Sequence, residues 1–362
     1  MPVLQTVSFF SGCGFLDLGF EDAGFTSMFV NELDPEFMRA YQHSRRILGH
    51  QPPVHGYSTA SIETFLGACE LHHVMERGGP DNLTGFIGGP PCPDFSVGGK
   101  NRGRHGDHGR LTKIYFELIK QEQPDWFLFE NVKGLWSTKR HKKFYNEQIA
   151  SVQKAGYVTT DRLINSIEYG APQDRSRVIC IGFSKKLMTR MGLKTLEFPW
   201  LRHTHHSMDV LKLPWPTTNA FQNDVRRPHG IPAALTVQHW FTHNRVQTHP
   251  NADMHFTPRA GLAKFKVIAE GDDSRKSYKR LHRHRYSPTA CYGNNEVHLH
   301  PTLPRRISIA EALAIQTLPA NFSLPRDLTL SDGFKTVGNG VPYVAANGLA
   351  RSISAFINEN YP

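Results

Sequence analysis

Residues 86–110 read FIGGPPCPDFSVGGKNRGRHGDHGR, and this stretch decides how the whole chain is interpreted. A short apolar run ends in two glycines, after which Cys92 stands between Pro91 and Pro93. Proline fixes its own backbone φ and pushes the residue before it towards extended geometry, so we expect the Cys92 thiol to have a fixed orientation. A segment with five glycines and several cations follows, which predicts a glycine-rich cationic loop.

Two interpretations of Cys92 are open. The apolar run 84–88 predicts a strand, and open α/β sheets bind ligands beyond the carboxyl ends of their strands. An oriented thiol near positive charge would ionise there and act as a nucleophile. The alternative is a small core cysteine, which is the commoner fate of this residue. The flanking prolines and the glycines that follow favour the nucleophile.

Apolar runs and helical spacing alternate along much of the chain. We expect strands at 3–10, 26–30, 84–88, 125–130 and 178–183, and helices at 15–23, 114–120, 141–155, 308–317 and 341–357. Strands that alternate with helices predict the α/β class, with a mostly parallel sheet covered on both faces. No apolar run approaches the roughly 20 residues of a membrane span, and the first residues show no basic leader, so we expect no secretion signal.

The pattern changes after about residue 185. Residues 186–300 are rich in Pro, His and Arg, with short β-like runs and no clean period, which predicts a separate, irregular domain that forms a surface. Twelve histidines fall there, namely His203, His205, His206, His229, His239, His243, His249, His255, His282, His284, His298 and His300. Without a cysteine at zinc spacing beside them, we predict no metal site.

The composition fits a globular protein of one large or two modest domains, with 362 residues, 39% hydrophobic and 20% charged. The five cysteines lie far apart and form no CxxC pair, so a reducing cytoplasm fits better than a disulfide framework. A formal charge of +10 favours a polyanionic partner, with nucleic acid ahead of membrane. The alternative is a solvated basic surface.

The N-terminal segment has the plan of a nucleotide pocket. A strand leads into the turn Gly12-Cys13-Gly14, a helix follows, and the acid Glu32 comes about 20 residues later, where it could accept hydrogen bonds from ribose hydroxyls. An ordinary tight turn and a surface acid would look the same. Because the third glycine of the dinucleotide fingerprint is missing, a ligand with ribose and adenine but no phosphate fits better, and S-adenosylmethionine is the candidate.

Two further groups stand at predicted strand ends. Glu130 ends the apolar strand 125–130, where a carboxylate is costly unless it is paired or acts as an acid. Arg175 and Arg177 precede the strand 178–183 and would point to the same side if extended. Two guanidiniums could position a carboxylate, a phosphate or the polar edge of a base. Taken singly, each group could equally be a capped strand end or a surface ion pair.

The chain resembles the C5-cytosine DNA methyltransferases nearly from end to end. The segments that carry the resemblance, in order, are FFSGCGFLDLGFEDAGF, NELD, GGPPCPDFSVGG, ENVKGL, QDRSR, RRISIAEALAIQTLP and FKTVGNGVPYVAANGLA. The resemblance implies a Rossmann-like methyltransferase domain at 1–185, completed by 330–362. It also implies a smaller, irregular, β-rich target-recognition domain at 186–304 and a hinge segment at 305–329.

The resemblance implies a reaction on a cytosine that has been flipped out of the duplex. The Cys92 thiolate would add to C6 and make C5 nucleophilic towards the methyl group. Glu130 would hold the N3 and amino edge of the base. Arg175 would support the O2 edge, and Arg177 would brace Glu130 or the loop.

The binding residues are likewise implied by the resemblance. The DNA contacts would be made by Ser96, Lys100, Arg102, Arg104 and Arg110. The cofactor pocket would comprise Phe10, Gly12, Gly14, Glu32, Leu33, Leu111, Asn339 and Val341. Tyr57 and Ser58 stand where many relatives carry an adenine-contacting Asp, so that contact is unassigned.

The expected function is methylation of cytosine C5 at a short duplex site by a cytoplasmic monomer, with S-adenosylmethionine as cofactor. A restriction endonuclease that acts on the same site is a candidate partner, and no membrane partner is expected. Rival functions are the same chemistry on RNA and a catalytically silent DNA-binding regulator. A nicotinamide oxidoreductase would rest on the Gly-x-Gly turn alone.

Overall fold

The computed structural model describes residues 1–68, 71–76, 79, 81–91, 107–258, 260–275, 277–290, 292 and 296–362. Within these ranges, no helix combines the length and the apolar character that a membrane span requires.

The described residues form one seven-stranded sheet in the order β3-β2-β1-β4-β5-β7-β6. Its strands are β1 (Val3–Phe9), β2 (Thr26–Asn31), β3 (Tyr57–Ser58), β4 (Asn82–Gly88), β5 (Trp126–Val132), β6 (Tyr157–Asn165) and β7 (Ser176–Ser184). All run parallel except β7, which is antiparallel to both β5 and β6. Only residues 166–175 join β6 to β7, too few for the crossover that a parallel pair needs. The predicted α/β class with a mostly parallel sheet is confirmed.

The connectivity of the sheet reverses between β1 and β4. From β1 the chain continues to β2 and β3 on one side, whereas β4 leads to β5 on the other. Open α/β sheets bind ligands at such a switch point, outside the carboxyl ends of the strands. Phe9 pairs with Gly88, and Gly88 pairs with Phe129, so the ends of β1, β4 and β5 lie level at this edge.

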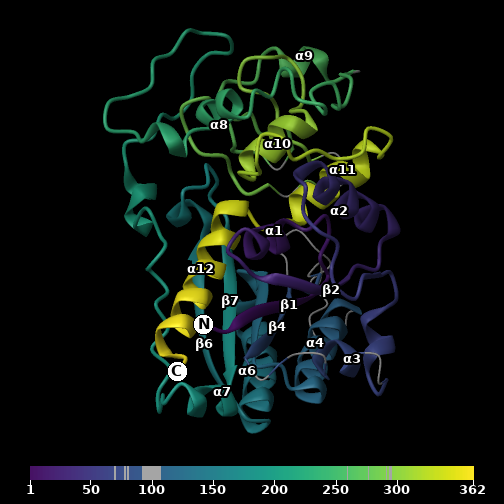
Figure 1. The fold of residues 1–362 in the computed structure, drawn as a ribbon. Coiled ribbons are helices and arrows are strands. Elements are labelled where there is room, and N and C mark those ends of the chain that lie inside the picture. The colour runs from purple at the N-terminus through teal and green to yellow at the C-terminus, as the bar shows by residue number, and fades with distance from the viewer. Residues whose placement is uncertain are drawn as a thin grey trace.

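Helices cover both faces of the sheet (Figure 1). One face carries α1 (Phe15–Glu21) and α12 (Tyr343–Asn360), and the other carries α4 (Asp107–Glu122) and α6 (Lys139–Lys154). Side chains alternate between the faces along each strand. Leu128 therefore packs in the cluster that contains Leu349 of α12, while Phe127 and Phe129 pack on Phe116 of α4, with ring centroids 6.2 and 4.9 Å away.

The helix α12 packs against the first helix of the chain. Asn347 donates a side-chain hydrogen bond to the Gly19 carbonyl at 3.0 Å. A Cβ atom on Gly19 would lie 2.5 Å from the Asn347 backbone nitrogen, so only glycine permits this close approach. The predicted helix 341–357 is thus present and completes the core on one face of the sheet.

The remaining helices are short, apart from α2. They are α2 (Pro35–Leu48), α3 (His72–Glu76), α5 (Gly134–Ser137), α7 (Lys185–Arg190), α8 (Val237–His243), α9 (Leu262–Phe265), α10 (Ile309–Ile315) and α11 (Leu330–Asn339), with 3₁₀ turns at Ile62–Phe65, Ser166–Tyr169, Met208–Lys212 and Ala233–Leu235. Helices α8 to α11 lie together beyond one end of the sheet, at the top of Figure 1.

The described part of region 186–304 differs from the β-rich expectation. This described part contains no β-strand, and its β-type backbone pairing is limited to isolated bridges such as Asn219 with Glu270 and Arg280 with Leu299. Buried polar side chains hold this region together instead. The Arg280 guanidinium is 1% exposed and donates to the carbonyls of Ile268 (2.9 Å), Leu303 (3.1 Å), His300 and Phe265. Because a side chain makes these hydrogen bonds, they do not form the repeated backbone–backbone pairing that defines a β-strand.

Three histidines of this region are buried and neutral. His282 and His298 are 2% and 4% exposed, and His300 lies beside Glu311 and Arg305. Burial lowers the pKa of His282 to about 4, of His298 to about 3 and of His300 to about 4, from ordinary values near 6.5. Below about pH 6.5, these histidines therefore bind protons in the unfolded chain but not in the folded chain. The free energy of unfolding consequently decreases as the pH is lowered through that range.

We predict that replacing His298 makes the protein less sensitive to acid. In the parent chain, His298 contributes about 1.4 kcal/mol to the loss of unfolding free energy between pH 7.5 and 5.5, because its folded pKa lies well below the unfolded one. The variant His298→Leu lacks this group. Urea unfolding at both pH values measures the difference. An equal loss in both proteins would contradict the prediction.

Candidate active site

Glu130 lies at the carboxyl end of β5 and is paired with an arginine of β7. Its Oε1 lies 2.9 Å from Nε of Arg177, and both side chains are 11% exposed. The sheet register explains the contact, because Val132 of β5 stands opposite Arg177. The carboxylate is thus held by a largely desolvated ion pair at the edge where open α/β sheets bind ligands.

The other oxygen of Glu130 faces the segment that leads to Cys92. A Cβ atom on Gly89 would lie 2.7 Å from Oε2 of Glu130, so the absence of a side chain at Gly89 makes room for the carboxylate. Asn131 contributes a second link, since its Nδ2 lies 3.4 Å from the Pro90 carbonyl. These contacts hold the end of β5 against the backbone just before Cys92. The roles of Gly89 and Asn131 were not predicted, although both residues belong to the quoted motifs.

Several predicted site residues lie outside the described residues. They are the nucleophile Cys92 and the DNA-contacting residues Ser96, Lys100, Arg102 and Arg104. Arg110, the remaining predicted DNA contact, is described. Its guanidinium forms an ion pair with Glu63 at 2.8 Å, and its side chain is 59% exposed.

Arg175 is buried where the start of β7 meets two later segments of the chain, and its predicted role at the O2 edge of the base stays a prediction. The side chain is 1% exposed, and its guanidinium donates to the carbonyls of Ala290 (3.1 Å), Gly338 (3.0 Å) and Asn339 (3.2 Å). β7 begins at Ser176, and the Arg175 N–H just before it donates to Asn165 Oδ1. Arg175 therefore joins the start of β7 to two later segments of the chain.

The predicted cofactor turn is closed by Glu32. The Gly12 N–H donates to Oε2 of Glu32 at 2.8 Å, and the Asp34 N–H donates to Oε1 at 2.9 Å. Burial raises the pKa of Glu32 above its ordinary value, partly offset by these two hydrogen bonds. Leu33, which follows the acid, is 61% exposed and offers an apolar surface at the same edge.

A buried charged cluster that the sequence did not reveal lies behind the turn. Arg45 of α2 donates to the Gly14 carbonyl at 2.6 Å and pairs with Glu21 at 2.6 Å. Tyr41 donates to Glu21 at 3.0 Å, and burial raises the pKa of Asp17 to about 6. The sequence analysis could not place Arg45 and Tyr41 beside Glu21, because it did not predict the helix α2 that carries them.

The other predicted cofactor residues differ in backbone conformation, packing and exposure. Phe10 has a positive φ of 56° and its ring centroid lies 6.4 Å from that of Tyr115. Leu111 packs on the cluster of apolar residues around Tyr115, Asn339 is exposed at the end of α11, and Val341 is 6% exposed. Their contacts with a cofactor stay predictions.

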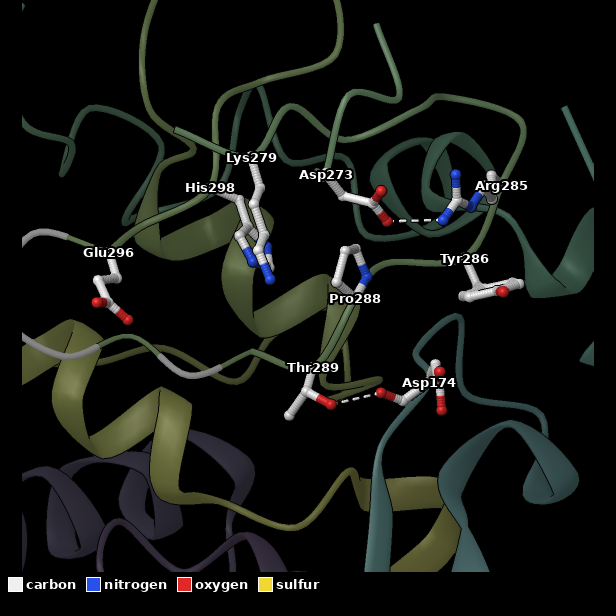
Figure 2. Close-up of a pocket in the computed structure, with 9 residues that line it drawn as sticks. All are labelled: Asp174, Asp273, Lys279, Arg285, Tyr286, Pro288, Thr289, Glu296 and His298. Atoms are coloured by element: carbon white, nitrogen blue, oxygen red, sulfur yellow. Dashed lines mark hydrogen bonds and ion pairs between the residues drawn. The ribbon is translucent and has the colours of Figure 1, made fainter. Parts of the chain in front are cut away.

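A polar pocket of about 320 Å³ lies where the segment before β7 meets residues 273–298 (Figure 2). Arg285 pairs with Asp273 at 2.7 Å, and the Thr289 hydroxyl donates to the Asp174 carbonyl at 2.6 Å. Lys279 and His298 also line the pocket. The described residues contain no group of three or more His, Cys, Asp or Glu side chains arranged to hold a metal ion.

Comparisons with known proteins identify the family of the chain. The family model for C-5 cytosine-specific DNA methylases matches residues 4–355. The chain is 52% identical to the type II methyltransferase M.NmeDI of Neisseria meningitidis over 98% of its length and 84% of the relative. It is 29% identical to the type II methyltransferase M.FnuDI of Fusobacterium nucleatum over 98% of this chain and 96% of that relative. The chain therefore belongs to the C-5 cytosine-specific DNA methylase family and is a DNA (cytosine-5)-methyltransferase, as predicted.

Solved structures share the fold. A provisionally assigned DNA modification methyltransferase encoded in an E. coli prophage superposes with a TM-score of 0.66 at 21% identity, covering 98% of this chain and 99% of that one. The Dnmt2 methyltransferase of S. pombe gives a TM-score of 0.62 at 11% identity, with 98% and 99% covered.

We predict that the two arginines fail in different ways when each is changed to lysine. Arg175→Lys is expected to lower the free energy of unfolding by about 2–3 kcal/mol, because one ammonium cannot serve three separated carbonyls. Arg177→Lys keeps a cation beside Glu130 and the fold, but loses the fixed fork and reduces methyl transfer at least roughly tenfold. Urea unfolding and initial methylation rates measure both effects. A stable but inactive Arg175→Lys protein would contradict this expectation and support the predicted role of Arg175 at the base.

Proposed function

We propose that this chain transfers a methyl group from S-adenosylmethionine to C5 of a flipped cytosine in a short, specific duplex site, through a covalent bond between Cys92 and C6. The observation that carries the proposal is the placement of Glu130. Its carboxylate is fixed between Arg177 and Gly89, which lies three residues before Cys92, at the edge where open α/β sheets bind ligands. A hydrogen-bonding acid and a thiol are the pair that this chemistry requires.

The Cys92 thiolate starts the proposed cycle. It adds to C6, and the ring electrons that this addition displaces make C5 nucleophilic while negative charge develops at N3. Glu130 acts at N3 in its protonated form, whose O–H donates a proton or a hydrogen bond as that charge forms. After C5 has accepted the methyl group, it gives up its proton to solvent, and the electrons of that C–H bond restore the ring double bond as the C6–S bond breaks. The thiolate is regenerated, and a proton placed on N3 returns to Glu130.

The arginines support this cycle without taking part in bond formation. Arg177 braces Glu130 through the 2.9 Å contact, so the carboxylate keeps its orientation when the base arrives. Arg175 acts as a positioning residue, because it holds the segment around Asn339 next to the start of β7.

The residues around Glu32 fit S-adenosylmethionine better than a dinucleotide. The Gly12 N–H is already bonded to Glu32, so it is not available to a phosphate oxygen, and the buried carboxylate would repel one. The same carboxylate has lone pairs left for ribose hydroxyls, and the exposed Leu33 can pack on adenine. S-adenosylmethionine, when bound, would supply the electrophilic methyl group.

Duplex DNA is the proposed substrate, and RNA is the rival. The relatives at 52% and 29% identity are named type II methyltransferases, which supports action at a short specific site beside a cognate restriction endonuclease. The net charge of +10 and the large region 186–304 suit a duplex partner. The protein is proposed to act as a cytoplasmic monomer. Bisulfite sequencing of DNA from cells that express the chain would reveal both the activity and the target.

The covalent step can be tested by trapping. With S-adenosylmethionine present, duplex DNA that carries 5-fluorocytosine at the target is expected to become covalently bound to the parent protein, because fluorine cannot leave C5 as the proton does. Cys92→Ala is expected to lose trapping and methylation while it still binds DNA. Cys180→Ala removes a different buried cysteine and is expected to retain both. Denaturing gel electrophoresis measures the adduct, and trapping by Cys92→Ala would refute the proposed nucleophile.

The cofactor affinity is expected to fall on acidification. Ionised Glu32 accepts hydrogen bonds from ribose, and its pKa is raised by burial, so protonation begins at a higher pH than for an ordinary carboxyl. Below that pKa the affinity falls by up to about tenfold per pH unit. Glu32→Gln is expected to bind more weakly at pH 7.5 and to lose this pH dependence. Calorimetry from pH 7.5 to 5 measures it, and an unchanged pH profile in the variant would contradict the role of Glu32.

A further inference from the structure

A group of exposed cations lies at the start of α6, outside the motifs and site residues named above. We call it the α6 basic surface, and it consists of Lys139, Arg140, Lys142 and Lys143. Three of the four line a shallow depression of about 470 Å³, together with Asn146, Glu147 and Ala150. Lys133 adds a fifth exposed cation just before α5.

Packing of α6 does not require these cations. The helix buries its opposite side, through His141, Phe144, Tyr145, Gln148 and Val152. In the described part of the chain, none of the four cations forms an ion pair with a carboxylate, and Glu147 is the acid that shares the depression. Lys142 instead lies over the Trp136 ring, with its Nζ 5.5 Å from the ring centroid.

Helix stability does not account for the cations either. The N-terminus of a helix is the positive end of its dipole, so acidic side chains stabilise the first turn and cations destabilise it by about 0.3–1 kcal/mol each. The first turn of α6 contains no acid, and Thr138 makes no side-chain capping bond. A sequence that breaks a local rule without a compensating contact points to a function for the residues concerned.

The α6 basic surface is also placed at the edge where the proposed site lies. β5 ends at Val132, two residues after Glu130, and only residues 133–138 separate it from Lys139. Leu135 of α5 is fully buried, which anchors this link to the core. A duplex with one base at Glu130 carries a phosphate charge about every 1.7 Å along its axis, so its flanks present a dense row of anions at this edge.

We propose that the α6 basic surface binds backbone phosphates of the duplex beside the target site, without reading its sequence. The inference rests on the proposed action on duplex DNA. It adds a contact surface on the sheet domain that is independent of region 186–304. Phosphate neutralisation by lysine and arginine releases counterions, so this surface makes DNA binding more dependent on salt.

The test compares DNA binding by the parent chain and by Lys139→Ala/Lys142→Ala/Lys143→Ala over a range of salt concentrations. On a duplex of about 40 base pairs, the slope of log K against log salt is expected to become shallower by about 2 to 3, as each lost phosphate contact removes about 0.9. On a short duplex that ends near the target base, the two proteins are expected to show the same slope. Methylation at saturating DNA is expected to stay unchanged.

A control variant removes the same charge from the opposite edge of the sheet. Lys154, Lys185 and Lys186 are exposed near the amino end of β6 and the last residue of β7, where the Lys185 N–H donates to Gly156. The triple alanine variant of these lysines is expected to keep the parent slope on both duplexes. An unchanged slope in the α6 variant, or an equal change in the control, would overturn the proposal.

Two further readouts separate the possible failures. The thermal midpoint of the α6 variant is expected to equal or exceed that of the parent, because cations leave the positive end of a helix dipole. A lower midpoint together with weaker binding to both duplexes would show structural damage and overturn the proposal. Absence of methylation by the parent chain on every DNA would refute the proposed function, whereas the salt slopes decide the α6 basic surface separately.

Discussion

The ion pair between Glu130 and Arg177 is the interaction on which the site depends, and it exists because one strand runs against the others. Since β7 is antiparallel to β5, its first residues reach the edge where β5 ends. A parallel β7 would bring its last residues there, and Arg177 would stand at the far edge. The direction of one strand thus brings a guanidinium to the carboxylate, while Gly89 leaves room for the second oxygen.

The sequence predicted those features that depend on local pattern. Apolar runs located β1, β2, β4, β5 and β7, because a strand buried on both faces reads as a continuous apolar segment. The motifs predicted Glu130 and Glu32 at strand ends. The carbonyl contacts of Arg175 were not predicted, because an alternation argument requires knowing at which residue the strand starts, and its role at the base stays a prediction. Helix α2 was missed even though Asp34 and Pro35 form a recognisable start, with the Asp34 side chain accepting from the Glu36 N–H.

Region 186–304 resisted prediction for a different reason. Its order depends on side chains that bond to backbone far away in sequence. Arg280 donates to the carbonyls of Ile268 and Leu303, and the Arg283 N–H donates to Oε1 of Glu270 at 2.7 Å. Such contacts leave no period in the sequence, so a stretch rich in Pro, His and Arg looks irregular whether or not it is well packed. From the sequence alone, an arginine is also expected to lie on the surface, so its burial cannot be predicted until its hydrogen-bond acceptors are known.

The position of α12 has a consequence for how the protein is made. Residues 343–360 cover the face of the sheet that carries Trp126, Ile181 and Phe183, yet they are synthesised long after those strands. On the ribosome, this apolar face of the sheet stays exposed until α12 has been synthesised, and exposed apolar surface promotes aggregation and chaperone binding. Competence to modify DNA would accordingly emerge in a single late step of biosynthesis rather than gradually.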